Sequence, residues 1–137
     1  MIDIPIIEIY CNNNFGCAEI LAGYLNFYSK RSIQLIILTN GLQEIHPLSI
    51  QVMMEDGIDI SVSVSQLISN QGKRKVKKKI IIKTELIEPE LFENNTHYYK
   101  VNDPFISTKY DEIVIGFRAM REELKKMSIA IIGELES

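Results

Sequence analysis

The chain has 137 residues, of which 46% are hydrophobic, and its formal net charge is only −3. This length suits one domain with a single core and is too short for two ordinary domains, so we expect residues 1–137 to form one domain. Acidic and basic residues are mixed along the chain, which gives no reason to expect binding to nucleic acid or to a membrane.

The apolar runs are too short to cross a bilayer, and the first residues do not have the charged start of a signal peptide. We therefore expect a cytoplasmic protein. Its two cysteines, Cys11 and Cys17, do not make the disulfide framework of a secreted domain, so both are expected as reduced thiols. We expect no cofactor and no metal, because His46 and His97 lack the spacing of metal ligands and are interpreted as structural.

Apolar periodicity and turn residues predict strands that alternate with helices. In chain order we expect a strand over 4–10, a helix over 17–28, a strand over 33–39, a helix over 47–56, a short helix over 64–69, a strand over 79–83, a short acidic helix over 88–93, a strand over 97–101 and a long last helix capped by Thr108. The apolar face of that last helix includes Phe117, Met120 and Leu124, and the tail over 129–132 is expected in the core. Such alternation predicts an α/β fold with a parallel sheet and helices on both faces.

The segment between the first strand and the first helix carries the clearest functional signal. It reads Cys11, Asn12, Asn13, Asn14, Phe15, Gly16, Cys17 and Ala18. A small polar turn in this position directs backbone N–H groups and a helix N-terminus at one point, which suits an anion. Cys11 ends the strand, where a thiolate would face that anion. The asparagines have two interpretations, as loop architecture or as amide donors to the anion.

This loop resembles that of the low-molecular-weight tyrosine phosphatases and thioredoxin-coupled arsenate reductases, which reads Cys, five residues, Arg and Ser. Cys11 matches the nucleophile and Asn14 the structural Asn, whereas Cys17 stands in place of the Arg and Ala18 in place of the Ser. Further matches are the segments 46–61 and 110–124 and the Asp103-Pro104 pair, which is similar to the general-acid motif of this family. The resemblance covers nearly the whole chain. It implies a three-layer α/β/α domain with a four-stranded parallel sheet, of the phosphotyrosine phosphatase I-like type.

In the chemistry of that family the thiolate attacks the bound oxyanion, the Arg binds its oxygens and the Asp protonates the leaving oxygen. The resemblance assigns the first role to Cys11 and the third to Asp103. Cys17 cannot replace a bidentate guanidinium, and Ala18 supplies no hydroxyl. Segment 82–90 also lacks the cysteines that the reductase branch needs for its disulfide relay.

Three functions therefore remain open. The first is a phosphatase-like or arsenate reductase-like protein with impaired catalysis, which binds phosphate, arsenate or a similar oxyanion, or a protein partner. The second is an active phosphatase or arsenate reductase that uses Cys11, Asp103 and a compensating cation, although the sequence places none of the four arginines at the loop. The third is a thiol redox protein that uses Cys11 and Cys17. Cys17 also has a plainer interpretation, as a small buried helix residue.

Overall fold

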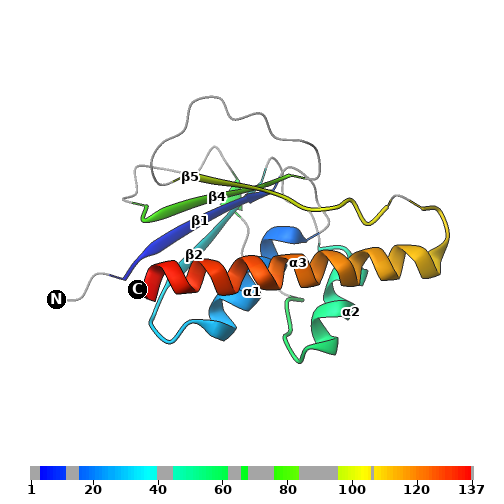
Figure 1. Cartoon of the computed structure of the whole chain (residues 1–137), viewed down its shortest axis with the longest axis horizontal. Helices are drawn as coiled ribbons and strands as arrows, with labels where there is room; N and C mark the ends of the chain where they lie inside the picture. Colours follow the sequence, from blue (N-terminus) through cyan, green and yellow to red (C-terminus); the bar gives the residue numbers. More distant parts are fainter. Residues whose placement is uncertain are drawn as a thin grey trace.

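The computed structural model of this chain describes residues 4–11, 16–39, 45–61, 66–67, 76–83, 96–105 and 107–136. The elements in chain order are β1 (Ile6–Cys11), α1 (Cys17–Tyr28), β2 (Gln34–Thr39), α2 (Pro47–Glu55), β3 (Gln66–Leu67), β4 (Lys78–Lys83), β5 (Thr96–Lys100) and α3 (Tyr110–Glu136). Strands and helices alternate as the sequence predicts from β1 to β3, whereas β3, β4 and β5 follow one another with no helix between them among the described residues. Figure 1 shows the long α3 running along the sheet.

The strands form one parallel sheet in the order β3-β2-β1-β4-β5. β1, β2, β4 and β5 are the four parallel strands that the sequence predicts, and the two-residue β3 adds a short edge. β1 lies between β2 and β4, and four of its six residues are buried, in line with its almost continuous apolar run. The prediction of an α/β fold with a parallel sheet is confirmed.

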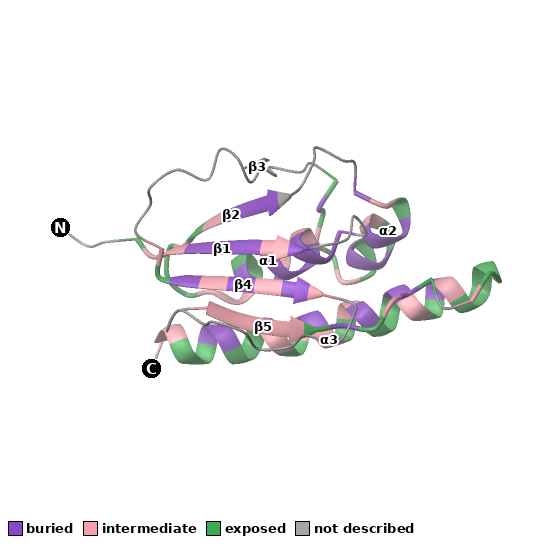
Figure 2. Cartoon of the chain, turned by 90° about the horizontal axis from the view of Figure 1, so that it is seen from above, coloured by how far each residue is buried: buried purple, intermediate pink, exposed green. Residues whose placement is uncertain are grey.

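Alternate residues of the two central strands face the helices. Ile7 and Ile9 of β1 and Ile80 and Ile82 of β4 are fully buried and belong to the same core as the buried faces of α1 and α3. Figure 1 shows α1 and α3 on the same side of the sheet, and Figure 2 shows buried positions along β1 and β4. Because side chains alternate along a strand, Cys11 is the last residue of β1 on this inner face.

The start of α2 follows from two adjacent residues. Pro47 occupies the first turn, where its missing N–H removes no helical hydrogen bond. His46 is the N-cap, and its Nδ1 accepts a hydrogen bond from Leu48 N at 3.1 Å. The His46 side chain thereby satisfies one of the first-turn donors of the helix, which is the structural role expected for it.

The long α3 contacts the rest of the domain along one face. Its buried residues recur every three or four positions and are Val114, Phe117, Met120, Leu124, Ser128, Ile131 and Ile132. Phe117, Met120 and Leu124 lie on the face that the sequence predicts. The tail is only partly as predicted, because Ile131 and Ile132 are buried but Ile129 is 52% exposed.

A short helix is predicted over 64–69, of which the structure describes only Gln66 and Leu67. Gln66–Leu67 form β3, which pairs in parallel with Leu38 and Thr39 of β2. The helix prediction was wrong there because a run this short does not distinguish a helix from an edge strand, and pairing with a neighbouring strand decides the outcome. The predicted acidic helix over 88–93 lies outside the described residues.

The start of α3 also differs from its prediction, which placed the cap at Thr108. The helix begins at Tyr110, and Ile113 N donates to Lys109 O at 3.0 Å, so Lys109 occupies the N-cap position. Ser107 Oγ in turn accepts a hydrogen bond from Lys109 N at 3.1 Å. A hydroxyl does lie beside the start of the helix, but it belongs to Ser107 and bonds the N-cap N–H in a local turn, and the helix begins one residue later than the Thr108 pattern implies.

Candidate active site

The turn from β1 into α1 depends on a glycine. Gly16 is the N-cap of α1 and has φ 102° and ψ 16°, a left-handed conformation that residues with a side chain rarely adopt. A Cβ atom at Gly16 would also lie 2.8 Å from Cγ2 of Ile45 and 3.0 Å from Ser49. Both backbone shape and space therefore require glycine at this point. The predicted loop residues Asn12, Asn13, Asn14 and Phe15 lie outside the described residues.

Helix α1 directs its N-terminus at this turn. Gly16 O accepts the first helical hydrogen bond from Ile20 N at 2.8 Å. The N–H groups of Cys17, Ala18 and Glu19 belong to the first turn, in which no carbonyl of the same helix is available to them. The positive end of the helix dipole therefore lies next to Cys11.

The two cysteines meet inside the protein. Cys11 is 6% exposed and Cys17 is 0% exposed, and both are thiols rather than a disulfide. A hydrogen bond with the Cys11 side chain, together with burial, raises the pKa of the Cys17 thiol well above its usual range. Cys17 Sγ also lies 3.3 Å from Met120 Sδ of α3, within hydrogen-bonding range for two sulfur atoms. The residue that replaces the Arg of the resembled loop is thus a buried neutral thiol.

Asp103 lies in a tight turn after β5. Its Oδ1 accepts a hydrogen bond from Phe105 N at 2.8 Å, which is the local bond expected for an Asp in a turn. Pro104 is buried and packs on α3 at Gly116, where a Cβ atom would come within 2.9 Å of the Pro104 backbone. The Asp103 side chain itself is half-buried, so it keeps access to solvent at the rim of the sheet.

Aromatic side chains connect this turn to α2. The rings of Phe105 and His46 lie 5.3 Å apart, those of His46 and Phe117 5.0 Å apart, and those of Phe105 and Phe117 5.4 Å apart. Burial lowers the pKa of His46 below its ordinary value of 6.5. The cluster fixes Phe105, two residues after Asp103, against the N-cap of α2.

Cys11 and Asp103 follow strands that end at the same edge of the sheet. Cys11 pairs in register with Ile82 of β4, and Ile82 pairs with Tyr99 of β5, four residues before Asp103. Two strand spacings separate Cys11 from Tyr99, roughly 10 Å. On α3, Gly116 contacts Pro104 and Met120 contacts Cys17, and these two positions are one helical turn apart. The structure therefore brings the Asp103 turn and the cysteine pair to neighbouring parts of one helix face.

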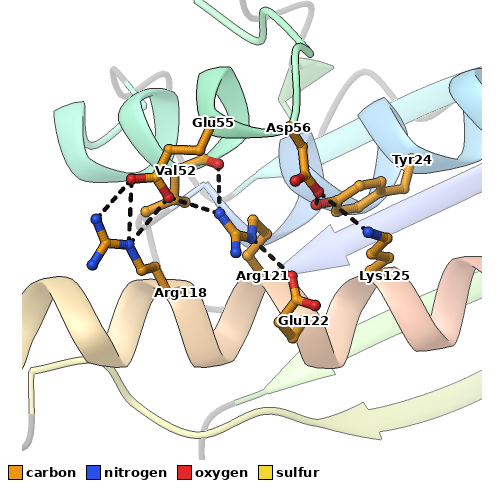
Figure 3. A network of polar contacts seen from close by, with 8 residues as sticks. All are labelled: Tyr24, Val52, Glu55, Asp56, Arg118, Arg121, Glu122 and Lys125. Atoms are coloured by element: carbon orange, nitrogen blue, oxygen red, sulfur yellow. Dashed lines mark hydrogen bonds and ion pairs between the residues drawn. The ribbon is translucent and has the colours of Figure 1, made fainter.

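Two arginines of α3 bind α2 instead of the cysteine turn. The Arg118 guanidinium donates to Glu55 through Nε at 3.1 Å and through Nη2 at 2.8 Å. Arg121 Nη1 donates to Glu55 Oε1 at 2.8 Å and to the carbonyl oxygen of Val52 at 2.9 Å. The last carbonyls of α2 lack helical partners, so Arg121 satisfies one of them, as cations at helix C-termini do. Figure 3 shows both guanidinium groups directed at this end of α2.

The remaining two arginines are Arg31 and Arg74. Arg31 lines a cavity of about 620 Å³ together with Ile4 and Pro5, which precede β1, and Leu135 of α3. This cavity lies at the opposite end of β1 from Cys11. Arg74 lies outside the described residues. Among the described arginines, none supplies the guanidinium that Cys17 replaces.

In the described part of the chain, no group of three or more His, Cys, Asp and Glu side chains could hold a metal ion. None of its helices is long and apolar enough to cross a membrane.

The fold of this chain recurs in proteins of known structure. The chain is similar to an arsenate reductase in the phosphate binding state, with a TM-score of 0.76, 18% identity, and coverage of 96% of this chain and 98% of that one. This chain has the arsenate reductase fold. The YwlE arginine phosphatase from Geobacillus stearothermophilus shares it, with a TM-score of 0.67, 13% identity, and coverage of 96% and 93%.

Another protein of known structure shares this fold. The arsenate reductase from Archaeoglobus fulgidus has a TM-score of 0.70 with this chain at 10% identity, and the match covers 93% of this chain and 98% of that one. No protein-family model and no curated protein matches the sequence. The resemblance inferred from the loop and the Asp103-Pro104 pair is thus confirmed for the fold, and these matches extend over almost the full length of each chain.

Sequence reasoning missed two residues that shape this site. Gly116 permits the close approach of Pro104, and its signal was a glycine inside a strongly helical pattern, which often marks a close backbone contact. Met120 was assigned to the core, but its contact with Cys17 was not foreseen because the two residues are 103 positions apart. No local pattern indicates which distant side chain a buried thiol will meet.

Proposed function

We propose that this protein binds a phosphate-like or arsenate-like oxyanion at the Cys11–Ala18 loop and has little or no catalytic turnover. The observation that carries this proposal is the burial of Cys17, which is 0% exposed and contacts Met120 at the position where the resembled family has Arg. An anion site needs donors, and the N-terminus of α1 supplies them without a guanidinium.

Impaired catalysis follows from the groups that stabilise charge in the transition state. A neutral thiol at position 17 and a methyl group at position 18 provide no charge-assisted donor to an equatorial oxygen. Loss of one oxyanion donor alone typically lowers the rate by about 10²–10³. Arg118 and Arg121 do not compensate, because both are engaged at Glu55.

Binding without turnover would use neutral donors. The first-turn N–H groups of α1 and the amide groups of Asn12, Asn13 and Asn14 form hydrogen bonds with an oxyanion without a full positive charge. An arsenate reductase with a similar fold has been solved in the phosphate binding state, which supports phosphate as the first ligand to test.

Thermal unfolding in added phosphate, at constant ionic strength, tests the binding part of the proposal. A ligand at ten times its Kd stabilises the folded state by about 1.4 kcal/mol, so phosphate should raise the Tm of the wild type and chloride should not. Asn14→Asp places a negative charge in the loop and should abolish the shift. Asn26→Asp is the matched control, because Asn26 is exposed near the other end of α1. Equal phosphate shifts in the two variants would contradict the proposed site.

Hydrolysis of a small aryl phosphate tests the catalytic part. We expect no hydrolysis above background by the wild type or by Cys11→Ser, and measurable activity in Cys17→Arg combined with Ala18→Ser. Cys17→Gln with Ala18→Ser controls for side-chain size without the charge, and the Tm of each variant shows whether the enlarged residue 17 is tolerated. Wild-type turnover that Cys11→Ser abolishes would contradict impaired catalysis and would establish an active phosphatase that uses Cys11.

A further inference from the structure

Three sulfur atoms from three elements gather beside the Gly16 turn. Cys11 closes β1, Cys17 opens α1 and Met120 lies in the middle of α3. The Cys17 side chain forms a hydrogen bond with that of Cys11, and Cys17 Sγ lies 3.3 Å from Met120 Sδ. The cluster is therefore connected through Cys17, and it is almost completely shielded from water.

This donor set is chemically selective. Thiolate and thioether ligands bind Cu(I), whereas carboxylate and water ligands favour Mg²⁺ and Ca²⁺. A structural Zn²⁺ site requires four Cys, His or carboxylate ligands, and no group of even three such side chains is suitably arranged in the described part of the chain. Met120 contributes a donor that only a soft cation accepts well. Two thiols and one thioether therefore favour a soft cation as the ligand of this cluster.

We propose that Cys11, Cys17 and Met120 form a binding site for a soft monovalent cation, Cu(I). The separations are compatible with shared ligation. Two sulfur ligands that each lie about 2.3 Å from one cation, the metal–thiolate distance of Zn²⁺, are at most about 4.6 Å apart. Cys17 and Met120 already lie within this limit.

Electrostatics support the bound form. Cys17 is the first residue of α1, so both thiolates would lie at the positive end of the helix dipole. A bound cation favours the thiolate form of its ligands, because a coordinating thiol loses its proton.

The binding step balances without a redox partner. Each thiol that becomes a ligand releases its proton to solvent, while the Met120 thioether donates a lone pair and releases none. Copper stays as Cu(I) throughout. Cys11 retains 6% exposure and is therefore the cluster member through which the cation enters. The oxyanion site proposed above uses N–H groups rather than sulfur atoms, so the two proposals can fail separately.

The test is an anaerobic titration of the full chain with Cu(I) against a chromophoric Cu(I) chelator. We expect the wild type to take up one equivalent. Outer ligand partners typically contribute 10–100-fold to metal affinity, so removal of a direct thiolate by Cys11→Ser or Cys17→Ser should weaken binding by at least about 100-fold. Met120→Leu removes only a weaker thioether ligand and should weaken binding by about 10-fold.

Two controls separate ligation from structural damage. Met53→Leu makes the same substitution at another fully buried methionine and should leave the affinity unchanged. X-ray absorption at the copper edge should show three sulfur neighbours in the wild type and two in Met120→Leu, a difference that altered packing alone does not produce. The proposal is overturned if the wild type takes up no Cu(I), if Met120→Leu matches Met53→Leu in affinity and coordination, or if Zn²⁺ binds equally well. Phosphate-induced stabilisation of Cys17→Ser reports independently on the oxyanion site.

Discussion

Gly116 of α3 lies so close to Pro104 that a Cβ atom there would come within 2.9 Å of the Pro104 Cα and O atoms. Both neighbours are backbone atoms, which cannot rotate away as the end of a flexible side chain does. The packing of the Asp103 turn on α3 therefore depends on the absence of a side chain at this one position.

Alanine at position 116 should consequently destabilise the protein. Helix propensity alone favours Ala over Gly by about 1 kcal/mol, but the clash with Pro104 outweighs this gain. Gly133 of the same helix has open space around its Cβ position, so Gly133→Ala should stabilise the protein. Urea denaturation of the two variants measures both signs. A stabilised Gly116→Ala protein would show that the Asp103 turn is not held against α3 in solution.

His46 should make stability depend on pH in the acidic range. Its Nδ1 accepts the hydrogen bond from Leu48 N only while the imidazole is neutral, and burial lowers its pKa below 6.5. A group whose folded-state pKa is lowered contributes stability that is present above pH 6.5 and is lost as the pH falls through the folded-state pKa. We expect the free energy of unfolding of the wild type to decrease over this window.

The matched variant for this prediction is His46→Asn. Asn retains a side-chain acceptor at the N-cap but does not titrate, so its unfolding free energy should change less with pH over the same range. His46→Ala removes the acceptor and should cost about 1 kcal/mol at pH 7.5. Both variants also lose the packing of the His46 ring on Phe117, which lowers stability at every pH. The decisive quantity is therefore the slope of the unfolding free energy against pH. Equal slopes in wild type and His46→Asn would be inconsistent with this role.

A hydrogen bond between α1 and the end of α2 should strengthen with ionisation of Asp56. The Tyr24 hydroxyl donates to Asp56 Oδ2 at 2.6 Å, and this bond is the main reason for the lowered pKa of Asp56. Tyr24→Phe should lower the free energy of unfolding by about 1 kcal/mol at pH 7. This value is near the lower end of the range for hydrogen bonds to charged groups, because the Asp56 carboxylate is partly solvated.

The cost of Tyr24→Phe should depend on pH in a defined direction. A carboxylate with a lowered folded-state pKa contributes stability above pH 3.8 and loses it as the pH falls through the folded-state pKa. The difference between wild type and Tyr24→Phe should therefore shrink below about pH 4. Tyr28→Phe, one turn further along α1, leaves the Tyr24–Asp56 bond in place and serves as the control. A difference that stays constant down to pH 2.5 would rule out this linkage.

Arg118 and Arg121 should contribute unequally although both bind Glu55. The Arg121 side chain is 13% exposed and also bonds the Val52 carbonyl, whereas that of Arg118 is 47% exposed. Loss of a partner from a buried carbonyl costs about 1–3 kcal/mol, so Arg121→Ala should be clearly destabilising. Arg118→Ala removes an exposed ion pair and should have little measurable effect.

The salt dependence of the two substitution effects tests the unequal roles of Arg118 and Arg121. Urea denaturation in 1 M NaCl should remove the small contribution of Arg118, because salt screens exposed charges. It should leave most of the Arg121→Ala effect, since the bond to Val52 O does not depend on a second charge. Equal effects of the two substitutions at low salt would contradict the distinct role of Arg121.

Local sequence patterns predicted most of the fold. The bounds of α1 agree with the prediction of 17–28, and β2, β4 and β5 agree within one residue at each end. These elements have strong apolar periodicity and clear breaks, such as Gly16 before α1. The two-residue β3 was missed because its identity depends on pairing with β2, which lies outside its own sequence.

The candidate site was predictable only in its local parts. The sequence indicated Cys11 at the end of a strand, a helix starting at Cys17 and a turn at Asp103, since each follows from neighbouring residues. The contacts of Cys17 with Met120 and of Gly116 with Pro104 depend on how α3 lies against the domain. Such tertiary contacts join residues far apart in the chain, and no single-sequence periodicity encodes them.

The burial of Cys17 between α1 and α3 gives the protein an internal probe of its own opening. A thiol reagent reaches a residue with 0% exposure only after the two helices separate, so its labelling rate under native conditions measures the free energy of that separation. Cys11, at the end of β1 and 6% exposed, requires a smaller fluctuation. The ratio of the two labelling rates, compared with the global unfolding free energy, distinguishes local opening at the Gly16 turn from detachment of α3.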